Sequence, residues 1–198
     1  MARAAGTGVR VIAGSRRGRR LVVPVGDGVR PTKDIVREAM FSALESRAMI
    51  ADAAVVDLYA GSGALAIESL SRGAARAVLV ERDPSALEAI SRNLDQLDLR
   101  ARARVVRSNV ASFLAAPPPA EGPFDLAFAD PPYETSDDTV AALIGSLVAP
   151  GWLAAGAVIA VERPARAQTR PPDGFQACWE RTFGDTLVVF VDAFDPSS

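Results

Sequence analysis

Two short segments of this chain carry side chains that could act on a ligand. The first, Asp57-Leu58-Tyr59-Ala60-Gly61-Ser62-Gly63, closes an apolar run over 53–58. The second, Asp130-Pro131-Pro132-Tyr133, follows an apolar run over 124–129. Residues that follow the strands of a parallel sheet lie at its carboxyl edge, where ligands bind. We therefore interpret both segments as candidate parts of a ligand site.

The glycine-containing segment suits an adenosine ligand. Gly61 and Gly63 would let the backbone approach a ligand closely, and the helix expected next offers unpaired N–H groups. Glu81 ends the next apolar run and could accept hydrogen bonds from both ribose hydroxyls. Asp57 suits a cation, such as the amino group of S-adenosylmethionine, and would sit badly beside a pyrophosphate. This favours S-adenosylmethionine, while a dinucleotide and a plain structural turn stay open.

The Asp-Pro-Pro-Tyr segment suits methylation of an exocyclic base amine, whose lone pair is delocalised into the ring. The Asp130 carboxylate and the Pro131 carbonyl could accept its two hydrogens and favour a tetrahedral nitrogen. Pro131 and Pro132 fix the backbone that aims this carbonyl. Tyr133 supplies a ring on which an extruded base can stack. The alternative is a stiff turn without chemistry.

The composition excludes several other mechanisms. The chain has no histidine and one cysteine, Cys178. This excludes Ser-His-Asp and Cys-His machinery and an internal disulfide, and it argues against a zinc site, so no metal is expected. C5-pyrimidine methylation needs a cysteine nucleophile, whereas Cys178 lies in a β-rich tail. Amine methylation needs no strong base, because the sulfonium is an excellent leaving group.

The elements that must position these residues alternate along the chain, which predicts a doubly wound α/β sheet. Apolar runs predict strands over 53–58, 76–81, 103–107, 124–129 and 156–162. Helices are expected over 64–72, from Pro84 after an Asp83 cap, in a short stretch after 107, and over 137–147. Two β-rich runs over 175–183 and 186–192, separated by Gly184-Asp185, predict a closing antiparallel hairpin.

The N-terminal region differs from this body, so we divide the chain into a basic arm over 1–30 and a methyltransferase domain over 31–198. The arm has seven arginines and one acid, a net charge of +6, which leaves −8 for the rest. Two β-type runs, 9–14 and 21–24, predict a hairpin whose turn displays arginines. Such an arm suits a polyanion contact, although a solvated tail is the alternative. Thr32 is expected to cap a helix from Lys33.

Taken together, the chain resembles the RsmD-type guanine-N2 methyltransferases of bacterial small-subunit ribosomal RNA, nearly end to end. The residues that carry the resemblance are Arg17-Gly18-Arg19 through Pro24, Arg30-Pro31-Thr32, 36–41, 57–65, 68–74, Asp130-Pro131-Pro132-Tyr133 and Gly184-Asp185-Thr186. The resemblance implies a Rossmann-like, seven-stranded class-I methyltransferase sheet with an antiparallel last hairpin.

The resemblance also implies roles for individual residues. The cofactor-binding residues would be Asp57, Tyr59, Gly61, Gly63, Glu81 and Asn109. The family often has an aspartate near position 109 that contacts the adenine amine, so the Asn109 amide oxygen would have to replace it. The target amine would be held by Asp130 with Pro131, Pro132 and Tyr133. The RNA-binding residues would be Arg16, Arg17, Arg19, Arg20, Arg30 and Thr32.

The function predicted from the sequence is therefore methyl transfer from S-adenosylmethionine to a guanine N2 of small-subunit ribosomal RNA, in an assembled or assembling subunit. The alternatives are DNA adenine-N6 or cytosine-N4 methylation and a non-catalytic RNA-binding assembly factor; a nicotinamide oxidoreductase is more distant. No apolar stretch is long enough to span a membrane. We expect a cytoplasmic monomer.

Overall fold

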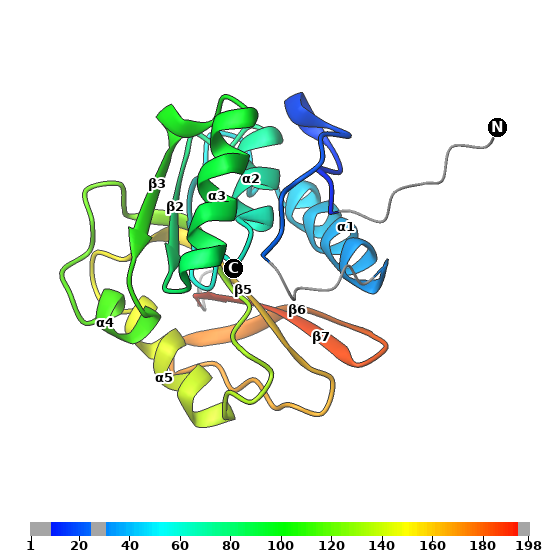
Figure 1. Cartoon of the computed structure of the whole chain (residues 1–198). Coiled ribbons are helices and arrows are strands. Elements are labelled where there is room, and N and C mark those ends of the chain that lie inside the picture. Colours follow the sequence, from blue (N-terminus) through cyan, green and yellow to red (C-terminus); the bar gives the residue numbers. More distant parts are fainter. Residues whose placement is uncertain (1–8, 25–30, 194–198) are drawn as a thin grey trace.

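The computed structural model describes residues 9–24 and 31–193, in which a mixed seven-stranded sheet is covered by helices (Figure 1). The strand order is β3-β2-β1-β4-β5-β7-β6. The strands are β1 (Ala54–Asp57), β2 (Arg76–Glu81), β3 (Ala103–Arg107), β4 (Phe124–Ala129), β5 (Leu153–Pro164), β6 (Phe175–Phe183) and β7 (Thr186–Ala193). The helices are α1 (Pro31–Ser46), α2 (Ala64–Ser71), α3 (Pro84–Gln96), α4 (Val110–Leu114) and α5 (Asp137–Leu147).

The sheet confirms the predicted fold class. Strands β3, β2, β1, β4 and β5 are parallel, whereas β7 runs antiparallel between β5 and β6. Strands β2, β3 and β4 have the predicted bounds, but β5 begins at Leu153 and ends at Pro164, beyond the predicted 156–162 at both ends. Its extra residues pair with the start of β4 and with β7, contacts that the apolar pattern alone does not reveal.

The core lies on both faces of the sheet, because successive strand residues point to opposite sides. In β1, Val55 packs with the face covered by α1, α2 and α3, while Val56 packs with the face covered by α4 and α5. Both side chains are fully buried. This burial on two faces explains why the strands are almost continuously apolar.

Side chains at the helix starts fix where the helices begin. Asp83 caps α3 by accepting hydrogen bonds from the Ser85 and Ala86 amides, as predicted. The prediction for α1 was wrong: the helix begins at Pro31, so Thr32 lies in its first turn and not at the cap. Proline is favoured there because its missing N–H would have no helical partner. Among the described residues, none of the helices combines the length and apolar character needed to cross a membrane.

The described part of the basic arm, residues 9–24, folds back on the body of the protein. An antiparallel bridge joins Arg10 and Arg20, and a 3-10 turn spans Gly14–Arg16, so the predicted pairing is present but its two runs form no strands. A Cβ on Gly14 would lie 2.0 Å from the Ser71 carbonyl oxygen, so only glycine fits here. The buried Glu68 carboxylate accepts hydrogen bonds from the Ile12 and Ala13 amides at 2.7 and 2.9 Å. The arm is thus docked through α2.

Candidate active site

A cavity of about 1220 Å³ opens at the carboxyl ends of the parallel strands, where an open α/β sheet binds ligands. Both candidate segments line it. From the first come Asp57, Tyr59 and Gly61, joined by Glu81 and Asn109. From the second come all four residues Asp130, Pro131, Pro132 and Tyr133. The topology therefore brings together side chains that are separated by more than 70 positions in the sequence.

Asp57 ends β1 beneath this cavity and is almost fully buried. Its Oδ2 accepts a hydrogen bond from the Ala66 amide, in the first turn of α2, at 3.2 Å. Burial raises the pKa of Asp57 to about 7, and the nearby charges of Asp130 and Glu81 act in the same direction. A cationic group in the cavity would favour its ionised form.

The two glycines of the loop do different things. Gly61 has φ 53° and donates its amide to Glu81 Oε2 at 2.8 Å, so it shapes the cavity wall. Gly63 does not line the cavity among the described residues. A Cβ on it would lie 3.0 Å from a Leu79 methyl carbon, so Gly63 lets α2 pack closely on the sheet.

Glu81 is held by three backbone amides. Oε2 accepts from Gly61, and Oε1 accepts from Arg82 at 2.7 Å and Asp83 at 2.9 Å. These contacts fix a carboxylate at the end of β2, facing the cavity. Pre-orientation of this kind lowers the entropic cost of binding a ligand.

Asn109 lines the cavity as the N-cap of α4. Its Oδ1 accepts the Ser112 amide at 2.8 Å, so this oxygen has one lone pair left for a ligand. The Asn109 side chain therefore caps α4 and also forms part of the cavity wall.

The Asp-Pro-Pro-Tyr segment follows β4 directly, on the other side of β1 from Glu81. The Tyr133 side chain is half-exposed. Arg166 lies with its guanidinium carbon 5.0 Å from the ring centroid and donates to the Tyr133 hydroxyl at 3.3 Å. The Tyr133 ring is thus in cation–π contact with Arg166 while half of the residue remains exposed.

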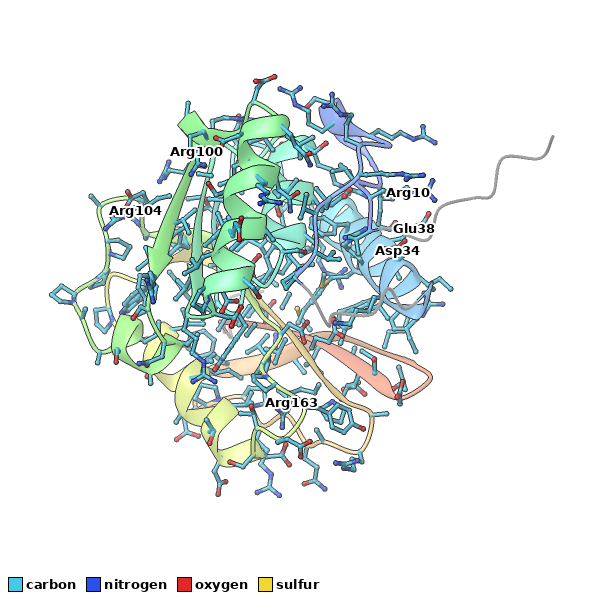
Figure 2. The ribbon with its side chains drawn as sticks, in the orientation of Figure 1. Arg10, Asp34, Glu38, Arg100, Arg104 and Arg163 are labelled. Carbon is cyan, nitrogen blue, oxygen red and sulfur yellow. The ribbon has the colours of Figure 1, made fainter. Side chains whose placement is uncertain are left out.

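Two residues that the sequence analysis missed belong to this part of the site. Arg163, labelled in Figure 2, is buried, and its Nη2 donates to the Thr135 carbonyl and to Asp137 Oδ1, both at 2.8 Å. It thereby holds the loop that follows Tyr133. Glu162 lines the cavity next to Asp130. Burial raises the pKa of Glu162 to about 8, and the charge of Asp130 adds to the rise.

The arginines of the arm lie elsewhere. Arg16 Nε donates to the Leu97 carbonyl at 2.6 Å and Arg19 Nη2 to the Gln96 carbonyl at 3.0 Å, at the C-terminal end of α3. Arg17 and Arg20 are exposed. None of these four lines the cavity in the part of the chain that the structure describes, although Val9 and Val23 of the arm do. The prediction for Arg30 falls outside the described residues.

Comparison with known proteins assigns this chain to a family. The family described as "Conserved hypothetical protein 95" matches residues 9–192. "Ribosomal RNA small subunit methyltransferase D" of Escherichia coli is 43% identical over 156 residues, which cover 78% of this chain and 74% of that protein. The chain belongs to the RsmD family.

Other members of the RsmD family agree along most of the chain. The Haemophilus influenzae protein of the same name is 34% identical over 177 residues, 89% of each chain. The solved structure titled "Putative methyltransferase yhhF from Escherichia coli" superposes with a TM-score of 0.79 at 37% identity, covering 94% of this chain and 98% of that one. The class-I methyltransferase fold predicted from the sequence is therefore confirmed.

Proposed function

We propose that this protein transfers a methyl group from S-adenosylmethionine to the exocyclic N2 of a guanine in small-subunit ribosomal RNA. The observation that carries the proposal is the shared cavity. Its β1–β2 side presents Asp57, Gly61 and Glu81, and its β4 side presents the Asp-Pro-Pro-Tyr segment. The RNA substrate is suggested by the relatives, which are named small-subunit ribosomal RNA methyltransferases.

The first half of the cavity fits S-adenosylmethionine. Asp57 is a buried acid whose raised pKa calls for a cationic partner, which the ligand's amino group would provide. Glu81 would hold the ribose hydroxyls, and Asn109 the adenine end. When bound, S-adenosylmethionine would supply a methyl group attached to a sulfonium. The neutral thioether that remains after transfer is a good leaving group.

The second half fits an amine acceptor. Asp130 and the Pro131 carbonyl would accept the two N2 hydrogens and turn the nitrogen lone pair toward the methyl group. Tyr133 would stack on the extruded base with the ring face that Arg166 does not cover. Arg163 would keep the loop at 133–135 in place during this contact. The proton lost from N2 can pass to the Asp130 carboxylate, because no stronger base is needed.

The proposal is tested by transfer of labelled methyl groups to small subunits from cells that lack this gene. We expect the label in N2-methylguanosine after digestion, and transfer by the Asp130→Ala protein that is slower by roughly 10²–10³-fold. Label in N6-methyladenosine or N4-methylcytidine would contradict the guanine assignment. Transfer to duplex DNA but not to ribosomal RNA would contradict the substrate class. Naked ribosomal RNA, assayed in parallel, reports whether assembly is required.

A further inference from the structure

We propose that Glu162 selects guanine at this site by accepting a hydrogen bond from the N1–H of the target base. The inference rests on the proposed function and deepens it, since it names the residue that distinguishes guanine from the other amino-bearing bases. The placement of Glu162 in the cavity is the starting observation.

Glu162 and Asp130 lie at the same level of the sheet edge. Strands β4 and β5 are parallel neighbours, and Ala129 pairs with Val161 at the end of their register. The residue after each member of this pair is an acid, Asp130 directly after β4 and Glu162 within β5, and both acids line the same cavity. Two carboxyl groups thus stand side by side where the target base must enter.

This placement is unfavourable unless a ligand uses it. Burial and the charge of Asp130 both raise the pKa of Glu162, and among the described residues Lys33, from α1, lowers it. In the described part of the chain, no hydrogen bond or ion pair holds the Glu162 carboxylate in the way that backbone amides hold Glu81. A partly buried acid without such partners is unfavourable for folding, so its presence in a cavity indicates a role in binding.

Guanine offers the matching pattern of donors. Its Watson–Crick edge carries N1–H directly beside the N2 amine, so two adjacent acceptors can engage both groups. Adenine and cytosine instead have an unprotonated ring nitrogen beside the amine, and its lone pair would face the Glu162 carboxylate. Sites built around a hydrogen bond to an N–H group reject analogues that lack it by roughly 10⁴–10⁵-fold.

The experiment uses 2-aminopurine, which keeps the amine at C2 but has no proton on N1. After the methylated position is mapped, small subunits are reconstituted with ribosomal RNA carrying either guanine or 2-aminopurine there. Above pH 8, where Glu162 is ionised and can only accept a hydrogen bond, we expect the wild-type protein to methylate guanine at least 100-fold faster. The Glu162→Gln protein should lose most of its rate on guanine, and its preference should shrink at least tenfold, because the glutamine amide can donate to the unprotonated N1.

Three controls separate this role from others. The affinity for S-adenosylmethionine, measured by calorimetry, should be unchanged in Glu162→Gln, which also shows that the variant is folded. Glu180→Gln, an exposed acid on β6, should behave as the wild type. The guanine preference should rise with pH as Glu162 ionises between Asp130 and Lys33. Titration of Asp57 affects both bases alike and cancels in the ratio.

The outcomes distinguish the inference from the proposed function. Equal rates of the wild-type protein on guanine and 2-aminopurine, or an unchanged preference in Glu162→Gln, would overturn the role of Glu162 while N2-methylguanosine still forms. A loss of S-adenosylmethionine binding in Glu162→Gln would assign Glu162 to the cofactor instead and also overturn it. If the wild-type protein made no N2-methylguanosine at all, the proposed function would fail and this inference with it.

Discussion

A group of acidic side chains and a group of arginines lie at opposite ends of helix α3. At its N-terminal end, Glu81 and Asp57 face the cavity together with Asp130 and Glu162. At its C-terminal end, Arg16 and Arg19 of the arm bind the last carbonyls of the helix. Figure 1 shows the arm in dark blue beside α1 and α2, at the end of α3 away from α4 and α5. The four acids line one cavity, whereas these two arginines bind backbone carbonyls of α3.

The separation defines what each group can do. A helix of 13 residues is about 20 Å long, so the tip of the arm cannot touch a base held beside Asp130. Arginines at a helix C-terminus also complement its dipole. Contacts with RNA at this end would therefore orient the substrate from a distance, while the cavity residues act on the base itself. The predictions below test this division.

The largest effect is expected from Asp130→Ala. Loss of a group that acts on the reacting nitrogen should lower kcat by roughly 10²–10³-fold, the range for one preorganised group that stabilises developing charge. Affinity for S-adenosylmethionine, measured by calorimetry, should stay the same, as should affinity for the small subunit. A variant that bound the cofactor normally and kept its full rate would place the chemistry elsewhere.

The arm should depend on Glu68 for its docking. Glu68→Ala removes a fully buried carboxylate bound to two arm amides and to Arg72 Nε, so the free energy of unfolding should fall by about 3 kcal/mol or more. Glu45→Ala is the matched control, because Glu45 pairs with the same arginine from a half-exposed position and should cost less than about 1 kcal/mol. Denaturant unfolding measures both. Equal losses would show that the arm does not depend on this contact.

Glu81→Ala should weaken S-adenosylmethionine binding by roughly 1–3 kcal/mol, the expected loss for a carboxylate's hydrogen bonds. Because Glu81 also binds three backbone amides, the melting temperature of the ligand-free protein must be measured beside the calorimetric affinity. An unchanged affinity would refute the ribose role.

Asp57→Asn should separate stability from binding in a pH-dependent way. The folded-state pKa of Asp57, about 7, lies above the ordinary aspartate value. The protonated form of Asp57 therefore stabilises the fold fully at low pH, and this stabilisation is lost as pH rises toward 7. Without ligand, the asparagine variant should therefore melt at a higher temperature than the wild type at pH 8 and nearly equally at pH 4. It should nevertheless bind S-adenosylmethionine more weakly. A wild type that melts higher at pH 8 would contradict the unfavourable burial of this charge.

The smallest effect is expected from the exposed arginines. Replacing Arg17 and Arg20 with serine should weaken binding to small subunits and reduce the slope of log K against log salt by roughly 1.5, without altering kcat. Replacing Arg16 and Arg19 should instead lower the melting temperature, since both bind carbonyls at the end of α3. An unaltered salt slope for Arg17 and Arg20 would leave these two as solubilising residues.

The sequence allowed the cofactor side of the cavity to be predicted more fully than the target side. Asp57 and Glu81 end apolar runs, and parallel topology places such residues at one edge whatever the details of packing. Glu162 lies near the end of β5, but no motif marks it, and its neighbour Asp130 is 32 positions earlier in the chain. The pairing of Arg163 with Asp137 likewise depends on the β4–β5 register, which spacing does not give.

In the arm, the sequence shows the charge of the side chains but not where they point. Its arginines form a basic cluster in the sequence, yet charge alone does not determine the direction of a side chain. That depends on Gly14, which lets the backbone approach the Ser71 carbonyl and turns Arg16 toward Leu97. Gly63 is a similar case, because the glycine pattern of the loop does not separate ligand approach from close packing.

The most direct test of the central claim is nucleoside mass spectrometry of small-subunit ribosomal RNA from cells with and without this gene, followed by mapping of the changed residue. Without the gene we expect the loss of one N2-methylguanosine, which should return on expression of the wild-type protein but not of Asp130→Ala. Loss of a different methylated nucleoside, or an unchanged ribosomal RNA, would contradict guanine-N2 methylation of the small subunit.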